Sequence, residues 1–452
     1  MRSGSNATSI VEVLRQRGFQ AYLVGGCVRD LLLGREPKDY DVATDATPKQ
    51  VMGIFPETYA VGAEFGVVLV PVAERDVASN VSTQSSSKFH AVEVATFRSD
   101  IGYSDGRHPD EVRFSGDPRE DVARRDFTIN GMLLDPVSGE VLDFVGGRKD
   151  LEAGIIRTIG DPDRRFGEDK LRMLRAVRFA ARFEYAIDPA TFAAMRRLAG
   201  EIQVVSRERV RDELTRMLTE GHGRRAFLLL DESGLLKHVL PEISAMKGVE
   251  QPAEFHPEGD VFVHTLLLLE NLPQPCSLTL AWGALLHDIG KPPTFRVAPD
   301  RIRFDGHVEV GVKMAEEICR RLRFSNDETE QILALVDNHM RFGHVNRMKE
   351  STLKKFLRMP GFDEHLALHR ADSLASHRNL STHEFIQQKR AEIPVEKMRP
   401  APLVTGEDLI AEGHVPGPKF REILGAVEDA QLEGRLNARD AALEFVRREF
   451  PV

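Results

Sequence analysis

Residues 22–45 read YLVGGCVRDLLLGREPKDYDVATD, and this stretch decides the fold of the first part of the chain. Its pattern predicts a strand that enters a glycine turn at Gly25 and Gly26, then a short helix, then a second strand. Side chains two apart on a strand point to the same face, so Asp39 and Asp41 are expected to reach one point. The stretch therefore predicts an α/β unit with two carboxylates near a glycine turn.

Two carboxylates at one point repel each other unless cations lie between them, and hard oxygen ligands favour Mg²⁺. Gly25 and Gly26 let backbone amides approach an anion at a helix start, where Arg29 adds a fixed positive charge. Amides and arginine on one side, with Mg²⁺-binding carboxylates on the other, would clamp a polyphosphate. The alternative is a tight turn and a solvated strand end, but both pieces together at this spacing favour the polyphosphate site.

The composition limits the classes of protein to which the chain can belong. Its 452 residues exceed one core, so about two to four domains are expected. No apolar run is long enough to span a bilayer, and residues 1–10 lack the apolar core of a signal peptide. Cys27, Cys276 and Cys319 have no metal or disulfide spacing, which predicts a reducing, cytoplasmic location. The net charge of −9 argues against a general nucleic-acid coat but not against a local basic site.

The pattern changes along the chain predict four regions. These are an α/β region, a helical region of period 3.6, a helical region rich in histidine and a helical tail, over residues 1–150, 151–250, 251–395 and 396–452. A mobile, serine-rich hairpin extension is expected over 75–88, and no regular element over 106–126. Residues 163–183 are expected to form one helix.

Two further segments of the first region carry candidate site residues. Glu93, in the expected strand HAVEVATF, could be a third carboxylate ligand, although a single Glu in a strand is often only solvated. In RRDFTIN (124–130), Arg125 could meet a phosphate, and Asp126 and Asn130 lie near helical i,i+4 spacing and could orient a ribose. The alternative for RRDFTIN is a capped helix start.

The segment FGEDKLRMLRAVRF (166–179) predicts a base-reading pair. On a helix Asp169 and Arg172 share a face; one side chain only accepts hydrogen bonds and the other only donates them. Together they match the amine and ring nitrogen on the pairing edges of cytosine and adenine, whereas uracil and guanine would leave buried partners unpaired. The alternative is a surface ion pair. The segment is also strongly basic, which favours contact with triphosphate or RNA backbone, through Arg164, Arg165, Lys170, Arg172, Arg175, Arg178 and Arg182.

The histidine-rich region predicts a metal site. The doublet His287-Asp288 lies in ALLHDIGKP, with His264 upstream and Asp372 downstream. Imidazole nitrogen with carboxylate oxygen suits Mn²⁺, Ni²⁺, Fe²⁺ or Mg²⁺, and a water on such a metal could hydrolyse a phosphate ester. Further ligands are expected at His307 and His339. Any one of these histidines alone would more simply be a packed or surface residue.

The head motifs, in their order along residues 20–240, resemble the bacterial tRNA nucleotidyltransferase and poly(A) polymerase family. This is the class II branch of the polymerase-β-like nucleotidyltransferases. The resemblance implies an α+β fold, with a head built on a small mixed sheet and an all-α neck, body and tail. It implies transfer of a nucleoside monophosphate from a triphosphate to an RNA 3′ end, with Asp39, Asp41 and Glu93 catalytic. It assigns nucleotide binding to Gly25, Gly26, Arg29, Arg125, Asp126, Asn130, Glu168, Asp169, Arg172, Arg175 and Arg178.

The order of the histidine and aspartate motifs resembles the HD phosphohydrolase superfamily. This second resemblance implies a helical HD domain with 2′,3′-cyclic phosphodiesterase, 2′-nucleotidase or phosphatase activity. The metal ligands that it implies are His264, His287, Asp288, His307, His339 and Asp372. The Mg²⁺ ligands expected in the head are Asp39 and Asp41.

Taken together, the two resemblances imply addition of C, C and A to tRNA 3′ ends from CTP and ATP. A poly(A) polymerase and an enzyme adding only CC or only A share the same head motifs and stay open as alternatives. The tail sequence EDAQLEGRLNARDAALEF is not basic, which favours the CCA branch. An HD hydrolase with a non-catalytic RNA-binding head is an alternative of another class, which the intact DYD argues against. The expected partners are the tRNA 3′ end, CTP and ATP, without a membrane, in a monomer or homodimer.

Overall fold

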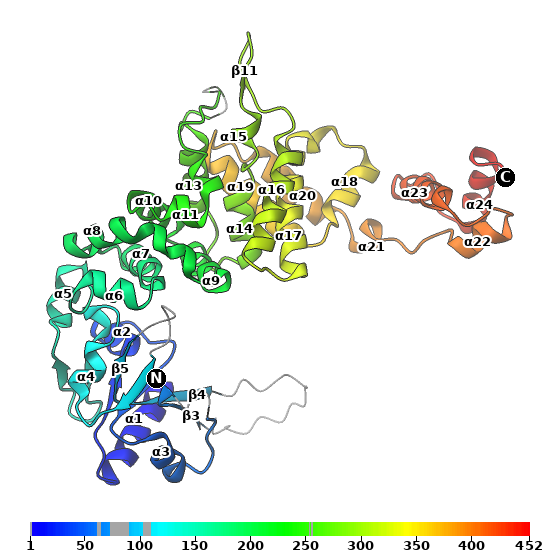
Figure 1. Ribbon diagram of the computed structural model, residues 1–452. Helices are drawn as coiled ribbons and strands as arrows, with labels where there is room; N and C mark the ends of the chain where they lie inside the picture. The colour runs from blue at the N-terminus through cyan, green and yellow to red at the C-terminus, as the bar shows by residue number, and fades with distance from the viewer. Residues whose placement is uncertain (1, 61–64, 73–89, 103–109, 253, 255) are drawn as a thin grey trace. The chain divides into compact units, whose positions relative to one another are not determined.

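A computed structural model describes residues 2–60, 65–72, 90–102, 110–252, 254 and 256–452 (Figure 1). The chain forms two compact units, Met1–Met217 with Arg225–Pro241, and Leu218–Arg224 with Glu242–Val452. The first unit combines a mixed sheet with helices and the second is mainly helical, so the expected α+β fold class is confirmed. The finer division into four regions stays a prediction. Among the residues described, no helix has both the length and the apolar character that a membrane span requires.

The first unit is built on a six-stranded sheet with the order β3-β4-β2-β1-β7-β8. Its strands are β1 Ala21–Val24, β2 Asp41–Thr44, β3 Val67–Val72, β4 His90–Thr96, β7 Met132–Leu134 and β8 Val141–Asp143. β2 and β4 are parallel and the other neighbours are antiparallel. The β-branched Val42, Val68 and Val94 are buried, as suits a packed sheet. Val24 pairs with Asp41, so the sheet itself brings the end of β1 beside the start of β2.

Three helices pack against strands of this sheet. α1 Arg2–Gln16 and α2 Gly26–Leu32 both contact β1, and α3 Pro48–Ile54 contacts β3 and β4. Thr47 and Gln50 form a capping box at the start of α3, with Pro48 at its first position. The predicted strand, glycine turn, helix and second strand of residues 22–45 are therefore confirmed.

The expectation of no regular element over 106–126 is wrong for its described part. β5 Arg98–Ile101 pairs with β6 Glu111–Phe114, and α4 Pro118–Ala123 follows. The turn formers that argued against structure instead start the helix, because Asp117 accepts a hydrogen bond from the Arg119 amide and Pro118 occupies the first helical position. The expected serine-rich extension over 75–88 lies outside the described residues.

The neck is two helices, not the single helix expected over 163–183. α6 Pro162–Glu168 ends before Asp169, and α7 begins at Leu171 and runs to Phe183. Asp169 has φ −145° and ψ 108°, and its carboxylate accepts the Leu171 amide, so it acts as a cap for α7. The 3.6-residue period continues across the break, which is why the pattern alone indicates one helix. The first unit also contains α5 Gly147–Ala153, β9 Ile155–Ile156, β10 Ala186–Ile187, α8 Pro189–Leu198, α9 Arg207–Thr219, most of α10 Gly223–Glu232 and α11 Leu236–Val239.

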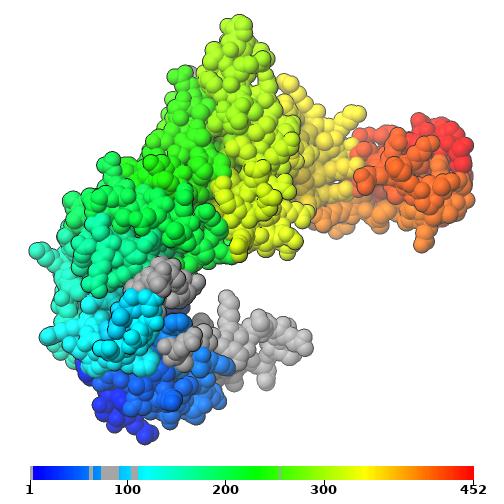
Figure 2. Space-filling model, in the orientation of Figure 1, coloured from blue at the N-terminus to red at the C-terminus, as the bar shows by residue number. Residues whose placement is uncertain are grey.

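The second unit packs helices around two mainly apolar ones, α13 Val261–Glu270 and α14 Leu278–Leu286. A helix that is apolar on most of its surface is buried by its neighbours. Those neighbours include α17 Asn326–Asn338 and α19 Phe362–Ala375, and α16 His307–Arg321 packs on α17. A short hairpin, β11 Arg296–Val297 with β12 Ile302–Arg303, stands out from the surface of this unit (Figures 1 and 2).

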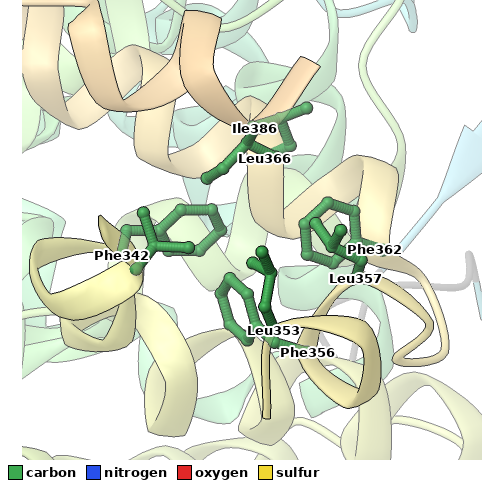
Figure 3. Close-up of a cluster of buried hydrophobic side chains, with 8 residues drawn as sticks. Phe342, Leu353, Phe356, Leu357, Phe362, Leu366 and Ile386 are labelled. Carbon is green, nitrogen blue, oxygen red and sulfur yellow. The ribbon is translucent and has the colours of Figure 1, made fainter. Parts of the chain in front are cut away.

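An aromatic cluster lies between α19 and the segments around it (Figure 3). Phe342, in the 3₁₀ segment η4 His339–Arg347, packs edge-to-face on Phe356 of α18 Glu350–Leu357, with ring centroids 5.0 Å apart. Leu366 of α19 and Ile386 of α20 Ser381–Glu392 close the other side. This cluster fixes the position of Phe342, which is 1% exposed.

The tail has a hydrophobic core of its own. α22 Gly406–Ala411, α23 Pro418–Leu432 and α24 Arg439–Glu449 enclose buried residues that include Leu409, Val427 and Val446. The Lys354 ammonium donates to the Leu432 carbonyl at 2.6 Å, which ties α18 to the end of α23. α23 and α24 pack against each other around this core.

Candidate active sites

Three carboxylates of the first unit gather at the start of β2. Asp41 is the first residue of β2 and pairs in register with Glu93 of the parallel strand β4. Asp39 lies just before the strand and is exposed. Burial and the negative charges of Glu93 and Asp39 raise the pKa of Asp41 to about 6, against an opposing effect of Arg125. Mutually repelling carboxylates that a cation would relieve form a donor set that fits Mg²⁺.

The glycine turn lies directly against this group. Gly25 has φ +78°, a conformation that favours glycine, and a Cβ there would come 3.2 Å from Arg125 Nη1 and 3.8 Å from Asp41 Oδ2. Arg125 is held in place by two hydrogen bonds to Asp121, of 3.0 and 3.2 Å. Gly25, Arg125 and Asp41 are therefore brought together, and the Arg29 guanidinium lies beside Gly26, where a Cβ would come 3.5 Å from Arg29 Nη2.

Arg29 is 4% exposed and its polar atoms are used inside the protein. It donates to Asp30 at 2.8 and 2.9 Å and to Asn130 Oδ1 at 2.6 Å. The Asn130 amide then donates to Asp126, which also accepts from Arg175 at 2.9 Å. The guanidinium further lies over the rings of Phe179 and Phe183 of α7, 5.3 and 4.7 Å from their centroids. These contacts favour a positioning role for Arg29 over the phosphate contact expected from the sequence.

We expect Arg29→Met to lower the free energy of unfolding by about 3–5 kcal/mol, because it leaves the buried Asp30 carboxylate without its cation. The matched control Arg35→Met removes an exposed guanidinium over the same Phe183 ring and should cost less than about 1 kcal/mol. Urea unfolding of both variants measures the difference. A loss of nucleotide binding by Arg29→Met at unchanged stability would instead support the phosphate contact.

A pocket of about 250 Å³ joins the RRD segment to the neck. It is lined by Arg124, Arg125, Asp126, Asp169, Arg172, Arg175 and Arg209. Asp126 is desolvated, but Arg175 and Asn130 outweigh this effect and lower its pKa to about 2. The structure thus brings Asp126 into one pocket with the expected base-reading residues Asp169 and Arg172, whereas Asn130 does not line the pocket and contacts it through Asp126; their roles stay predictions.

Asp169 and Arg172 both keep hydrogen-bonding capacity in this pocket. Asp169 accepts three hydrogen bonds, from the Leu171 amide and from both Nη atoms of Arg209, out of about four that a carboxylate can accept. Arg172 donates three of about five, to Glu168 and to the Arg165 and Arg124 carbonyls. The pair could therefore meet a base without breaking the contacts that orient it.

The remaining neck residues divide between pocket and interior. Glu168 is 8% exposed and accepts from Arg164, Arg165 and Arg172, so it holds Arg172 in place. Arg178 does not line the pocket: it is 5% exposed and donates to Glu213 at 2.6 Å. Sequence reasoning did not single out Arg209, whose partner lies forty residues earlier. The basic run RERVRDELTRML, residues 207–218, is a signal that could have indicated it.

In the second unit four histidines and two aspartates converge. Asp288 Oδ2 lies 3.1 Å from His287 Nε2, and Asp288 Oδ1 lies 3.6 and 3.8 Å from the Nε2 atoms of His339 and His307. Asp372 Oδ1 lies 3.1 Å from His264 Nε2. All six predicted ligands are brought together, and they fall into two groups: His264, His287 and Asp372, and Asp288, His307 and His339.

The imidazoles of this cluster are oriented by their other ring nitrogen. His287, His307 and His339 donate Nδ1–H to the carbonyls of Ala284, Phe304 and Val336, at 2.8, 2.9 and 2.7 Å. His264 donates Nδ1–H to Glu258 at 2.6 Å. The four Nε2 atoms are buried and make no hydrogen bond within the described chain. Imidazole nitrogens that face carboxylates in this way fit the donor set of a metal site.

Sequence reasoning missed Glu258, His256 and Lys291, which lie beside the cluster. Glu258 accepts from both His264 and His256, at 2.6 and 2.9 Å. Lys291 lies 2.6 Å from Asp288 and donates to Gln251 at 2.7 Å. His287 and Lys291 help to keep the pKa of Asp288 low although that carboxyl is buried. Lys291 belongs to HDIGK, one turn after the doublet, and spacing alone could have indicated it.

The cluster opens into a cavity of about 550 Å³. Its lining includes His287, Asp288, His307, His339 and Asp372 from the cluster, and Arg301, Ile302, Arg303 and Phe304 from the hairpin region. A cavity of this volume can hold a nucleotide-sized ligand.

Comparison with known proteins gives three matching family models. These are the poly(A) polymerase head domain over residues 21–157, the probable RNA and SrmB-binding site of polymerase A over 184–247, and the HD domain over 261–376. A CCA-adding enzyme of Lactococcus lactis is 32% identical over 449 residues, with 97% of this chain and 95% of that protein covered. A multifunctional CCA protein of Chromobacterium violaceum is 36% identical over 350 residues, covering 75% of this chain and 79% of its own.

The fold is also similar to that of solved CCA-adding enzymes. The Bacillus stearothermophilus CCA-adding enzyme in complex with CTP has a TM-score of 0.74 and 28% identity, with 99% of this chain and 98% of that chain covered. The Thermotoga maritima CCA-adding enzyme complexed with tRNA has a TM-score of 0.59 over 98% of this chain and 94% of its own. At 19% identity, the second likeness shows the fold alone.

Proposed function

Because the chain belongs to the family of CCA-adding tRNA nucleotidyltransferases, we propose that it adds C, C and A to tRNA 3′ ends from CTP and ATP. The observation that carries the proposal is the junction of two sites in the first unit. The carboxylates of Asp41 and Glu93 lie against the Gly25 turn. Arg125 lies beside that turn and also lines the pocket of Asp169 and Arg172. A triphosphate and its base thus have adjoining sites.

The carboxylates would hold two Mg²⁺ ions, which supply activation of the attacking 3′-hydroxyl and neutralise charge on the leaving pyrophosphate. The chain's own residues align the reactants. The amides at Gly25 and Gly26 face the phosphates from the start of α2, and Arg125 adds positive charge beside them. Since the hydroxyl must attack in line with the leaving group, fixed phosphate positions raise the rate through orientation.

Base choice follows from hydrogen-bond complementarity. Asp169 would accept from the amine of cytosine or adenine while Arg172 donates to the adjacent ring nitrogen. Uracil and guanine present a carbonyl and an N–H in the reverse order, so the acceptor of Asp169 and the donor of Arg172 that face the base would stay unpaired. Arg209 and Glu168 orient the pair from behind, so no nucleic-acid template is needed.

Three tRNA transcripts test this proposal: one that ends before CCA, one after the first C and one after CC. Each is incubated with a single labelled triphosphate. The first two should take only C, and the third only A. Long A tails on all three transcripts would identify a poly(A) polymerase, and addition to only some of them would identify a CC-only or A-only enzyme.

We infer a second, hydrolytic activity for the cluster of the second unit, carried by the convergence of four imidazole Nε2 atoms on Asp288 and Asp372. A divalent metal there, Mn²⁺, Ni²⁺, Fe²⁺ or Mg²⁺, would supply an activated water. The proposed substrates are 2′,3′-cyclic phosphates and phosphomonoesters at RNA ends, in the cytoplasm where tRNA is processed. A hydrolase with a non-catalytic head is the weaker alternative, since the head carboxylates are intact.

A further inference from the structure

One face of α19 and the turn after it is polar where it lines the cavity of the second unit. Its residues have the spacing i, i+3, i+4, i+7 and i+8, which is one side of a helix: His369, Asp372, Ser373, Ser376 and His377. Asp372 is accounted for by the cluster of metal ligands. The other four have no part in the hydrolytic site described above, although helix faces inside a protein are usually apolar.

The His369 ring is held in one orientation. It stacks on Phe342 with centroids 4.5 Å apart and an interplanar angle of 12°. Phe342 is itself fixed by the aromatic cluster, packed on Phe356 and Phe362 (Figure 3). A ring stacked on a neighbour that is itself fixed presents its nitrogens in preferred directions, so it can select a ligand by hydrogen-bond position.

The Nε2 atom of His369 is buried and has no hydrogen-bond partner within the described residues. An unpartnered buried nitrogen costs free energy unless a ligand or water meets it. Burial lowers the pKa of His369 to about 4, so the ring is neutral at pH 7 and offers one donor and one acceptor. A neutral hydrogen-bonding group suits a hydroxyl or a base edge better than it suits a phosphate.

The other walls include apolar and charged side chains. Ile302, Phe304 and Met340 are apolar, Arg301 and Arg303 are cationic, and Asp305 is anionic. Arg303 pairs with Asp300 at 2.8 Å. An apolar wall with one fixed neutral hydrogen-bonding group and nearby cations matches a nucleoside that carries a phosphate. Inorganic phosphate or pyrophosphate would leave the apolar wall and His369 without a partner.

We propose that His369 is a specificity-determining residue that binds the nucleoside of a ribonucleoside phosphate while the neighbouring cluster takes the phosphate. The proposal rests on the hydrolytic function above. In that reaction the oxygen of water bonds to phosphorus, one P–O ester bond breaks, and the leaving ribose oxygen takes up a proton. His369 contributes to holding the substrate and not to these bond changes.

His369→Phe tests the proposal because it keeps an aromatic ring to stack on Phe342 and removes only the nitrogens. With Mn²⁺ present, kcat/KM for adenosine 2′,3′-cyclic phosphate should fall about 10-fold, mainly through KM, as expected for one lost hydrogen bond. Hydrolysis of bis-p-nitrophenyl phosphate, which has neither ribose nor base, should stay within about twofold. The matched control His365→Phe, one turn earlier on α19 and outside the cavity lining, should leave both rates within about twofold.

Equilibrium binding of adenosine 2′-phosphate separates this proposal from the hydrolytic one. The wild type should bind it about 10-fold more tightly than His369→Phe does, whether or not either protein hydrolyses it. Hydrolysis of both substrates with unchanged nucleotide affinity in His369→Phe would overturn the subsite and keep the hydrolase. Tighter wild-type binding without hydrolysis would support the subsite and overturn the hydrolase. An equal fall for both substrates would also overturn the subsite, because it would show a structural role.

Discussion

Asp41→Asn is expected to lower the rate of nucleotide addition at least about 10³-fold while tRNA binding persists, since metal assistance is worth several kcal/mol of barrier. Asp41 pairs with Glu93 and lies against the Gly25 turn, so its loss removes the central carboxylate of the group. The rate is measured as labelled CMP added to a transcript without CCA, and tRNA binding by filter retention.

Asp45→Asn provides the matched control for this variant. Asp45 lies four residues further along, where it accepts the Gln20 amide at 2.8 Å, and an Asn side chain can still accept that hydrogen bond. Its addition rate should stay within about threefold of wild type. Near wild-type addition by Asp41→Asn would remove Asp41 from the catalytic group.

Asp288→Ala is expected to abolish hydrolysis of 2′,3′-cyclic phosphates, again by at least about 10³-fold. Asp288 faces His307 and His339 of its own group and His287 of the other group, so its removal takes away the carboxylate that lies between the two groups of ligands. Because the clusters of the two compact units share no residue, CCA addition should stay within about threefold of wild type. Bound Mn²⁺ per chain, measured after gel filtration, should fall in parallel with hydrolysis.

The control for this variant is Asp363→Ala, which removes an exposed carboxylate of the same unit that pairs with Arg390 at the surface. It should leave both activities and the bound metal unchanged. If the wild type hydrolyses no phosphate ester with Mn²⁺, Ni²⁺ or Mg²⁺, the cluster has only a structural role, in which it holds the helices together. If Asp288→Ala loses both activities at unchanged thermal stability, the second unit helps to place the tRNA and the separation of roles is wrong.

Local patterns predicted the parts of the site that depend on neighbours in sequence. The strand, glycine turn and second strand of residues 22–45 could be predicted because turn formers and β-branched residues act within a few positions. The HD doublet and its flanking ligands could be predicted because each lies in its own short motif. The capped start of α4 was misread, since its proline and aspartate also suit a loop.

Contacts between distant segments could not be predicted. The register of Asp41 with Glu93 depends on parallel pairing across fifty residues, and spacing carries no information about it. The burial of Arg29 depends on Asn130 and on two rings of α7. Asp169 shares a face with Arg172 in the sequence pattern, but the structure makes it a cap oriented by Arg209.

The central claim is that Asp169 and Arg172, and no nucleic-acid template, choose C and A. Sequencing the 3′ ends of tRNA after incubation with all four triphosphates tests it most directly. The wild type should leave CCA, and Asp169→Ala with Arg172→Ala should raise the share of U and G at least about 10-fold, as expected when hydrogen-bond discrimination is lost. Lys170→Ala, which changes one of the two residues between them, should still leave CCA. Unchanged CCA ends made more slowly by the double variant would contradict the claim and assign the pair to holding structure or phosphate.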